Sequence, residues 1–134
     1  MKLLLLFPLL LLASLLGKTP KGDFQFTMGM QNKTPVLRMS TTKTFACSNY
    51  GIIVRQGWSR DTLTLKIIGI DSRQACNNVP DLARETVALY GIKDKEFTMQ
   101  FLYENKINSF HIEFDGESFS ITPERFDFIH SVTK

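Results

Sequence analysis

The chain has 134 residues, of which 16 are Lys or Arg and 13 are Asp or Glu, so the formal net charge is +3 at neutral pH. The basic residues are scattered one at a time and do not alternate with exposed aromatic residues, which argues against a nucleic-acid-binding surface. With only two cysteines and two histidines, the chain predicts no zinc cage, and we expect no metal and no cofactor.

Residues 1–17 have the composition of a signal peptide. Lys2 precedes a nearly unbroken run of leucines that reaches Leu16, and Gly17 is a small residue at a plausible cleavage point. The apolar run is too short to span a bilayer comfortably, although an N-terminal membrane anchor is the alternative. We therefore expect a secreted or periplasmic protein whose mature part, residues 18–134, is a single domain with no membrane span.

The first half of the mature part alternates between apolar and polar residues with the period of a β-strand. Turn residues interrupt this alternation, and Pro35 restricts the strand that follows it to an edge or to a strand start. Strands are predicted at residues 24–30, 36–39, 43–48, 52–54 and 62–69, and turns at residues 32–35, 49–51 and 57–61.

The segment from Asp71 to Pro80 is polar and is the longest predicted loop. The next segment, residues 81–90, is ambiguous because Pro80 and the early Asp81 suit the start of a short helix. We favour a strand over residues 85–91 that pairs with residues 97–103.

The C-terminal third predicts a meander of three strands. Apolar side chains recur at every second position of residues 97–103, 110–114 and 119–122, and Asp115-Gly116 suits a tight hairpin turn. At least eight large apolar side chains would be buried together, each contributing roughly 1.5–3 kcal/mol. The last stretch, residues 123–134, is expected to form a final strand or one helical turn.

Eight or nine short strands, turns every eight to twelve residues and little helix indicate an all-β protein. The pattern predicts an antiparallel, immunoglobulin-like β-sandwich. A small closed β-barrel is the alternative.

The two cysteines, Cys47 and Cys76, both lie in the part predicted to be exported. An even number of cysteines in an oxidising compartment favours a disulfide. A disulfide that closes the loop between residues 47 and 76 would stabilise the fold by about 3–4 kcal/mol in the chain-entropy model. The alternative is two buried thiols that do not meet.

No catalytic arrangement is predicted. His111 lies on the predicted solvent face of a strand, His130 is four residues from the end, and no nucleophile elbow, phosphate-binding loop or metalloprotease helix occurs. Glu113, Asp115 and Glu117 cluster around a turn and have oxygen ligands for a cation. Charged residues beside a hairpin are usually solvated, so we predict neither a metal site nor an enzyme.

The best candidate for a binding surface is formed by Tyr50, Trp58 and Arg60. Aromatic residues and arginine on loops are typical of protein-contact and sugar-stacking sites. The alternative for Trp58, which we favour, is that its side chain folds back and caps the open end of the core.

The order of several segments is similar to that of a known group of proteins. Thr44-Phe45-Ala46-Cys47, Ile52-Ile53-Val54, the run from Asp61 to Ile70, Cys76 and the hairpins of residues 97–121 carry the likeness. In this order the chain resembles small exported β-sandwich proteins of Bacteroidetes-type bacteria. The resemblance implies the fold and export, and it implies no activity.

These observations predict a monomeric, exported, non-enzymatic β-sandwich that binds a protein, another macromolecule or a glycan through its loops. One alternative is a barrel-like carrier in which the Phe and Met residues line a cavity for a small apolar ligand. Another is a secreted enzyme inhibitor that uses the loop from Asp71 to Pro80 as its contact.

Overall fold

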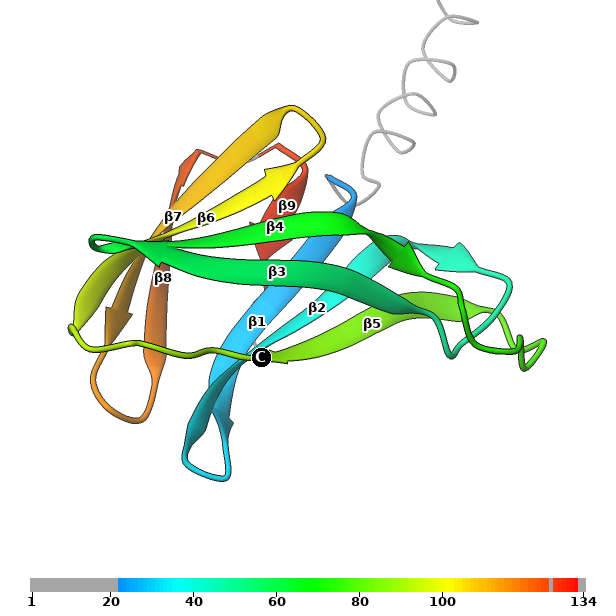
Figure 1. Ribbon diagram of the computed structural model, residues 1–134, viewed down its shortest axis with the longest axis horizontal. Helices are drawn as coiled ribbons and strands as arrows, with labels where there is room; N and C mark the ends of the chain where they lie inside the picture. The colour runs from blue at the N-terminus through cyan, green and yellow to red at the C-terminus, as the bar shows by residue number, and fades with distance from the viewer. Residues whose placement is uncertain (1–21, 126, 133–134) are drawn as a thin grey trace, which may run out of the picture.

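The computed structural model describes residues 22–125 and 127–132, so the predicted signal peptide lies outside the described residues. This part of the chain contains nine strands and no helix (Figure 1). The strands are β1 (Phe24–Gln31), β2 (Thr34–Phe45), β3 (Gly51–Ser59), β4 (Thr62–Asp71), β5 (Asp81–Ala88), β6 (Glu96–Tyr103), β7 (Lys106–Phe114), β8 (Phe119–Arg125) and β9 (Ile129–Ser131). Two packed sheets enclose the core, which confirms the β-sandwich prediction.

One sheet has the strand order β5-β2-β1-β9 and the other has the order β3-β4-β6-β7-β8. Five of the seven strand pairings are antiparallel, as predicted, whereas β4–β6 and β1–β9 are parallel. Parallel neighbours need a long connection between them. The connection from β4 to β6 contains β5, which joins the opposite sheet, and this excursion returns the chain to the end of the sheet where β4 began.

The prediction that residues 85–91 pair with residues 97–103 is wrong, and so is the helical alternative. β5 begins earlier, at Asp81, and pairs with β2 in the other sheet, where Val36 lies opposite Ala88. Alternation reports which side chains face the core, but it does not identify the neighbouring strand. After β5 the chain crosses between the sheets, and the Leu89 N–H donates to the Pro35 carbonyl at 2.9 Å.

Two predicted strand boundaries also need correction. One strand, β2, replaces the separate strands expected at residues 36–39 and 43–48; it ends at Phe45, and its pairing with β5 shifts register between Ser40 and Thr44. The turn expected at residues 57–61 contains only Arg60 and Asp61, because β3 continues to Ser59. Arg60 has φ of 57°, as a tight two-residue connection requires.

The closed-barrel alternative is also wrong. At the open side of the sandwich, β3 and β5 lie next to each other without a backbone ladder. Side chains make most of the connections there: the Gln56 amide donates to the Ala88 carbonyl at 2.7 Å, and the Glu85 carboxylate accepts the Ile52 N–H at 3.3 Å.

The core is built largely from aromatic side chains that point inward from both sheets. Phe26 of β1 packs against Phe101 and Phe110, with ring centroids 4.9 and 5.0 Å apart. The predicted inward faces of β6 and β7 are confirmed, since Phe97, Met99, Phe101, Phe110 and Ile112 are all buried. Phe119 and Ile121 of β8 are half-buried at the edge of this core.

Candidate functional site

The predicted surface of Tyr50, Trp58 and Arg60 is divided between the two ends of β3. Tyr50 immediately precedes this strand, whereas Trp58 and Arg60 lie at its end and in the turn that follows. Trp58 lies eight residue steps along extended chain from Tyr50, which corresponds to about 25 Å. The structure therefore brings Trp58 and Arg60 to one end of the sandwich and Tyr50 to the other.

Trp58 is half-buried and covers one end of the core. Its ring lies 5.4 Å from the ring of Phe97, and its indole N–H donates to the Tyr90 carbonyl. Gly91 has φ of 79°, and a Cβ atom there would lie 2.9 Å from the Trp58 nitrogen. The geometry favours the capping role for Trp58, which also holds the segment that crosses between the sheets.

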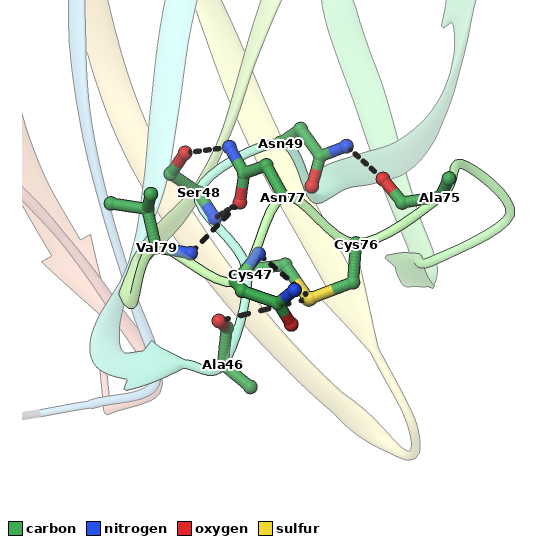
Figure 2. The surroundings of a disulfide bond; sticks show 9 residues. Ala46, Cys47, Ser48, Asn49, Ala75, Cys76, Asn77 and Val79 are labelled. Carbon is green, nitrogen blue, oxygen red and sulfur yellow. Dashed lines mark hydrogen bonds between the residues drawn. A yellow bond between two sulfur atoms is a disulfide. The ribbon is translucent and has the colours of Figure 1, made fainter.

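The predicted disulfide between Cys47 and Cys76 is present, with the two Cα atoms 5.3 Å apart. It joins the end of β2 to the loop between β4 and β5 (Figure 2). A disulfide is consistent with an oxidising, extracytoplasmic location.

We call residues 72–80 the braced loop; all nine are exposed to solvent. The Asn77 carboxamide holds this loop to the chain after β2, because its oxygen accepts the N–H groups of Ser48 and Val79, each at 3.1 Å. On the other side of Cys76 in the sequence, the Ala75 carbonyl accepts a hydrogen bond from the Asn49 amide at 2.6 Å (Figure 2). One covalent bond and several polar contacts therefore hold this loop in its conformation, and burial of apolar side chains does not.

The start of the braced loop is fixed by an ion pair. The Arg73 guanidinium donates to both oxygens of the Asp71 carboxylate, each at 2.9 Å, and the Arg73 backbone N–H donates to the same carboxylate. Such two-pronged contacts are stronger than single hydrogen bonds. They lower the pKa of Asp71 to about 2 from its ordinary value of 3.8.

This ion pair gives a prediction about pH. Because the pKa of Asp71 is lower in the folded protein, the pair stabilises the loop above about pH 4 and this stabilisation is lost as the pH falls through about 2. An NMR titration of the side-chain carboxyl carbons should place the pKa of Asp71 near 2, and Arg73→Ala should raise it. Arg84→Ala is the control and should leave it unchanged. A pKa near 3.8 in the unmodified protein would contradict the contact.

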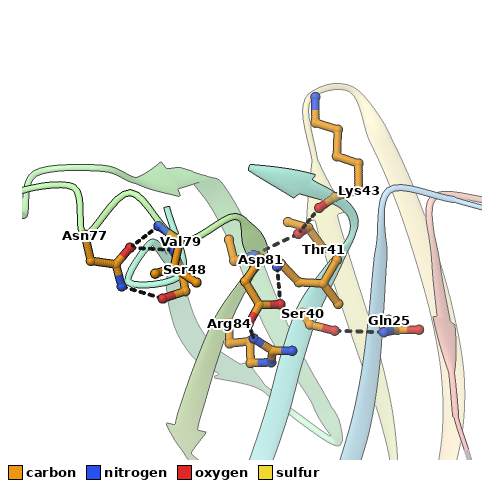
Figure 3. A network of polar contacts seen from close by, with 11 residues as sticks. Gln25, Ser40, Thr41, Lys43, Ser48, Asn77, Val79, Asp81 and Arg84 are labelled. Carbon is orange, nitrogen blue, oxygen red and sulfur yellow. Dashed lines mark hydrogen bonds and ion pairs between the residues drawn. The ribbon is translucent and has the colours of Figure 1, made fainter. Parts of the chain in front are cut away.

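The end of the braced loop leads into β5, where a second set of polar contacts forms (Figure 3). The Arg84 guanidinium lies 2.9 Å from the Asp81 carboxylate, and this contact lowers the pKa of Asp81. Thr41 is buried at the β2 bulge: its hydroxyl accepts the Ala83 N–H at 3.0 Å and donates to the Lys43 carbonyl at 2.8 Å. Thr41 thus replaces backbone hydrogen bonds that the bulge removes.

A shallow hollow of about 280 Å³ lies beside the braced loop. Its lining includes Tyr50, Asp71, Gln74, Arg84 and Glu85. The Tyr50 ring packs 6.0 Å from the ring of Phe45, so one side of it is covered. The structure thus associates Tyr50 with the braced loop, a grouping that the sequence alone does not reveal.

The cluster of Glu113, Asp115 and Glu117 does not converge on a common point. The Asp115 carboxylate closes the turn after β7, since it accepts the N–H groups of Glu117 and Ser118 and the Ser118 hydroxyl. These bonds lower the pKa of Asp115. Glu113 instead lies beside Glu96 and His111 on the outer face of the sheet.

Searches for relatives give no family assignment. The chain matches no protein-family model, and no curated protein or solved structure is significantly similar to it. The resemblance to exported Bacteroidetes-type proteins therefore stays a prediction. Within residues 22–125 and 127–132, no helix could cross a membrane.

Proposed function

We propose that this protein is an exported, monomeric, non-enzymatic binding domain, secreted or periplasmic, that recognises a partner protein through the braced loop. The observation that carries the proposal is an exposed nine-residue loop held in one shape by a disulfide and by the Asn77 contacts. Binding through a flexible loop costs the entropy of ordering it, and a loop ordered in advance avoids most of that cost. Loops on a rigid scaffold are common recognition elements.

The side chains of the braced loop suit a protein surface. Val79 is 55% exposed and offers an apolar contact, while Arg73 and Gln74 offer polar groups nearer the start of the same loop. Protein interfaces combine apolar and polar contacts of this kind. The inhibitor hypothesis is the form of this proposal in which the partner is an enzyme.

The other hypotheses receive less support from the geometry. Glycan stacking would need several open aromatic faces, whereas Trp58 caps the core, Tyr50 packs against Phe45, and Tyr90 offers a single ring that is 67% exposed. A carrier would need its aromatic residues to line a cavity, whereas Phe26 and Phe101 are 1% and 0% exposed and fill the space between the sheets.

The binding proposal can be tested by comparing surface variants. The protein, immobilised with its disulfide intact, is exposed to extracytoplasmic proteins of the producing organism and its surroundings, and bound proteins are quantified by mass spectrometry. Gln74→Ala combined with Val79→Ser should lose a partner that the unmodified protein retains. Ile107→Ser is the matched control, because Ile107 is 49% exposed and belongs to β7, two strands away from β4, which leads into the braced loop. Equal capture by the loop variant, or loss of capture only in Arg60→Ala, would contradict the proposal.

The disulfide should contribute stability as well as loop order. Cys47→Ser combined with Cys76→Ser should lower the free energy of unfolding by about 3 kcal/mol and the melting temperature by several degrees. The strand signal in circular dichroism should remain, since neither cysteine belongs to a strand. An unchanged melting temperature under non-reducing conditions would mean that the bridge does not form in solution.

A further inference from the structure

Three potential metal ligands meet on the outer face of the five-stranded sheet. Glu96 of β6 lies directly opposite Glu113 of β7, and His111 precedes Glu113 by two residues, so all three side chains project from the same face. One ligand atom from each residue lies within 4.8 Å of the other two. This group combines an imidazole nitrogen with two carboxylates.

The electrostatics of this cluster favour a bound cation. Like charges directly opposite each other on neighbouring strands are destabilising. The His111 ring lies 3.6 Å from the Glu113 carboxylate. In the described part of the chain, neither Glu96 nor Glu113 forms an ion pair with a lysine or arginine. A divalent ion would neutralise both carboxylates at once.

The ligand types in this cluster, and the paired strands that carry them, suit a zinc ion. Zn²⁺ accepts carboxylate oxygen and imidazole nitrogen at about 2.0–2.2 Å, and open sites often have three protein ligands and one water. Ligand atoms around such an ion lie roughly 3–3.5 Å apart. Glu96 and Glu113 are exposed and His111 is half-exposed, so these side chains have room to change rotamer toward this spacing, while the β6–β7 pairing fixes the backbone positions from which they project.

We propose that Glu96, His111 and Glu113 form a zinc-binding site whose fourth position faces solvent and holds water. The site is separate from the braced loop, because the start of β6 lies beside the β3–β4 turn, where the Thr98 N–H donates to the Asp61 carbonyl. The braced loop follows the opposite end of β4. The two surfaces can therefore be tested independently.

Calorimetric titration of zinc chloride into the untagged, disulfide-bonded protein tests the site. One zinc ion should bind per chain, and His111→Ala and Glu96→Gln should each weaken zinc binding by at least about tenfold. Glu117→Gln is the matched control: it removes an exposed carboxylate near this end of the sheet that lies outside the cluster, and it should leave zinc affinity unchanged.

Thermal unfolding provides a second readout. Zinc should raise the melting temperature of the unmodified protein and not that of His111→Ala. In a chelator, Glu96→Gln should melt at a higher temperature than the unmodified protein, because the repulsion between Glu96 and Glu113 is removed. Circular dichroism in the chelator establishes that each variant is folded.

The assignment would be overturned if the unmodified protein showed no saturable zinc binding, or if His111→Ala retained full zinc affinity. Saturable binding of calcium or magnesium that does not respond to His111→Ala, together with weak zinc binding, would also overturn it. That result would identify a carboxylate site for harder ions.

Discussion

Replacing Phe101 by alanine is expected to lower the free energy of unfolding by about 3–5 kcal/mol. Phe101 is fully buried, and its ring lies 4.9 Å from that of Phe26 and 5.8 Å from that of Phe110. Truncation removes a large apolar side chain, leaves a cavity and abolishes two aromatic pairs, each of which contributes about 0.5–1.5 kcal/mol beyond burial. Since domains are stable by only about 5–15 kcal/mol, this is a large fraction of the total.

Urea denaturation measures this loss, and two further variants make the result specific. Phe101→Leu keeps most of the side-chain volume and should cost about 1.5 kcal/mol or less. Ile68→Ala on neighbouring β4 removes an apolar side chain that is 43% exposed on the opposite face, and it should change stability by about 0.5 kcal/mol at most. A loss below about 1 kcal/mol for Phe101→Ala would show that the two faces of β6 are assigned the wrong way round.

The inward faces of β6 and β7 could be predicted because burial is periodic in a strand. Phe97, Phe101 and Phe110 recur in phase with that period, and shifting them by one residue would expose every one of them. The same local reasoning identified Asp115-Gly116 as a turn. The Asp115 carboxylate and Gly116, with φ of 100°, form that turn in the structure.

Strand partners could not be predicted in the same way. The alternation in β5 is compatible with any sheet that buries Ala83, and only the three-dimensional arrangement selects β2 as its neighbour. The parallel pairing of β4 with β6 follows from that choice. Pairings between distant segments depend on the whole core, which a single stretch of sequence does not reveal.

In the candidate sites, too, some features could be predicted from the sequence, whereas others arise only from the fold. The Cys47–Cys76 bridge could be predicted from cysteine number. The Asn77–Val79 contact is a local turn that asparagine often forms, whereas the Asn77–Ser48 contact could not be predicted, because it joins segments 29 residues apart. The His-x-Glu spacing of His111 and Glu113 is visible in the sequence, but Glu96 joins them only through the register of two strands. Tyr50 and Trp58 were grouped because both lie near predicted turns, and those turns are at opposite ends of β3.

The second large effect is expected from a polar residue inside the core. Asn108 lies on the inward face of β7, opposite Phe101, and is 1% exposed. Its side-chain oxygen accepts the backbone N–H groups of Asp127, Phe128 and Ile129 at 2.9, 3.0 and 3.1 Å. Its amide donates to the Asp127 carboxylate at 3.0 Å. One side chain therefore satisfies the backbone at the entry to β9.

Asn108→Ala should lower the free energy of unfolding by about 4 kcal/mol, because each buried donor left without a partner costs about 1–3 kcal/mol and water can reach some of them. Denaturant unfolding measures the loss. Hydrogen exchange should show that the amides of residues 127–132 lose protection before the rest of the sandwich does. A loss below about 1 kcal/mol would show that other groups can satisfy this backbone.

Exchanging the residues at positions 108 and 127 tests whether Asn108 acts as a hydrogen-bond acceptor or only fills space in the core. Asn108→Asp keeps an oxygen for the three N–H groups but places a second carboxylate beside Asp127, so it should also destabilise the fold. Adding Asp127→Asn restores a donor opposite the new carboxylate and should recover most of the loss. Because β9 pairs with β1 at Phe24 and Ile129, recovery would mean that one buried acceptor oxygen at position 108 of the five-stranded sheet holds the edge of the four-stranded sheet in place.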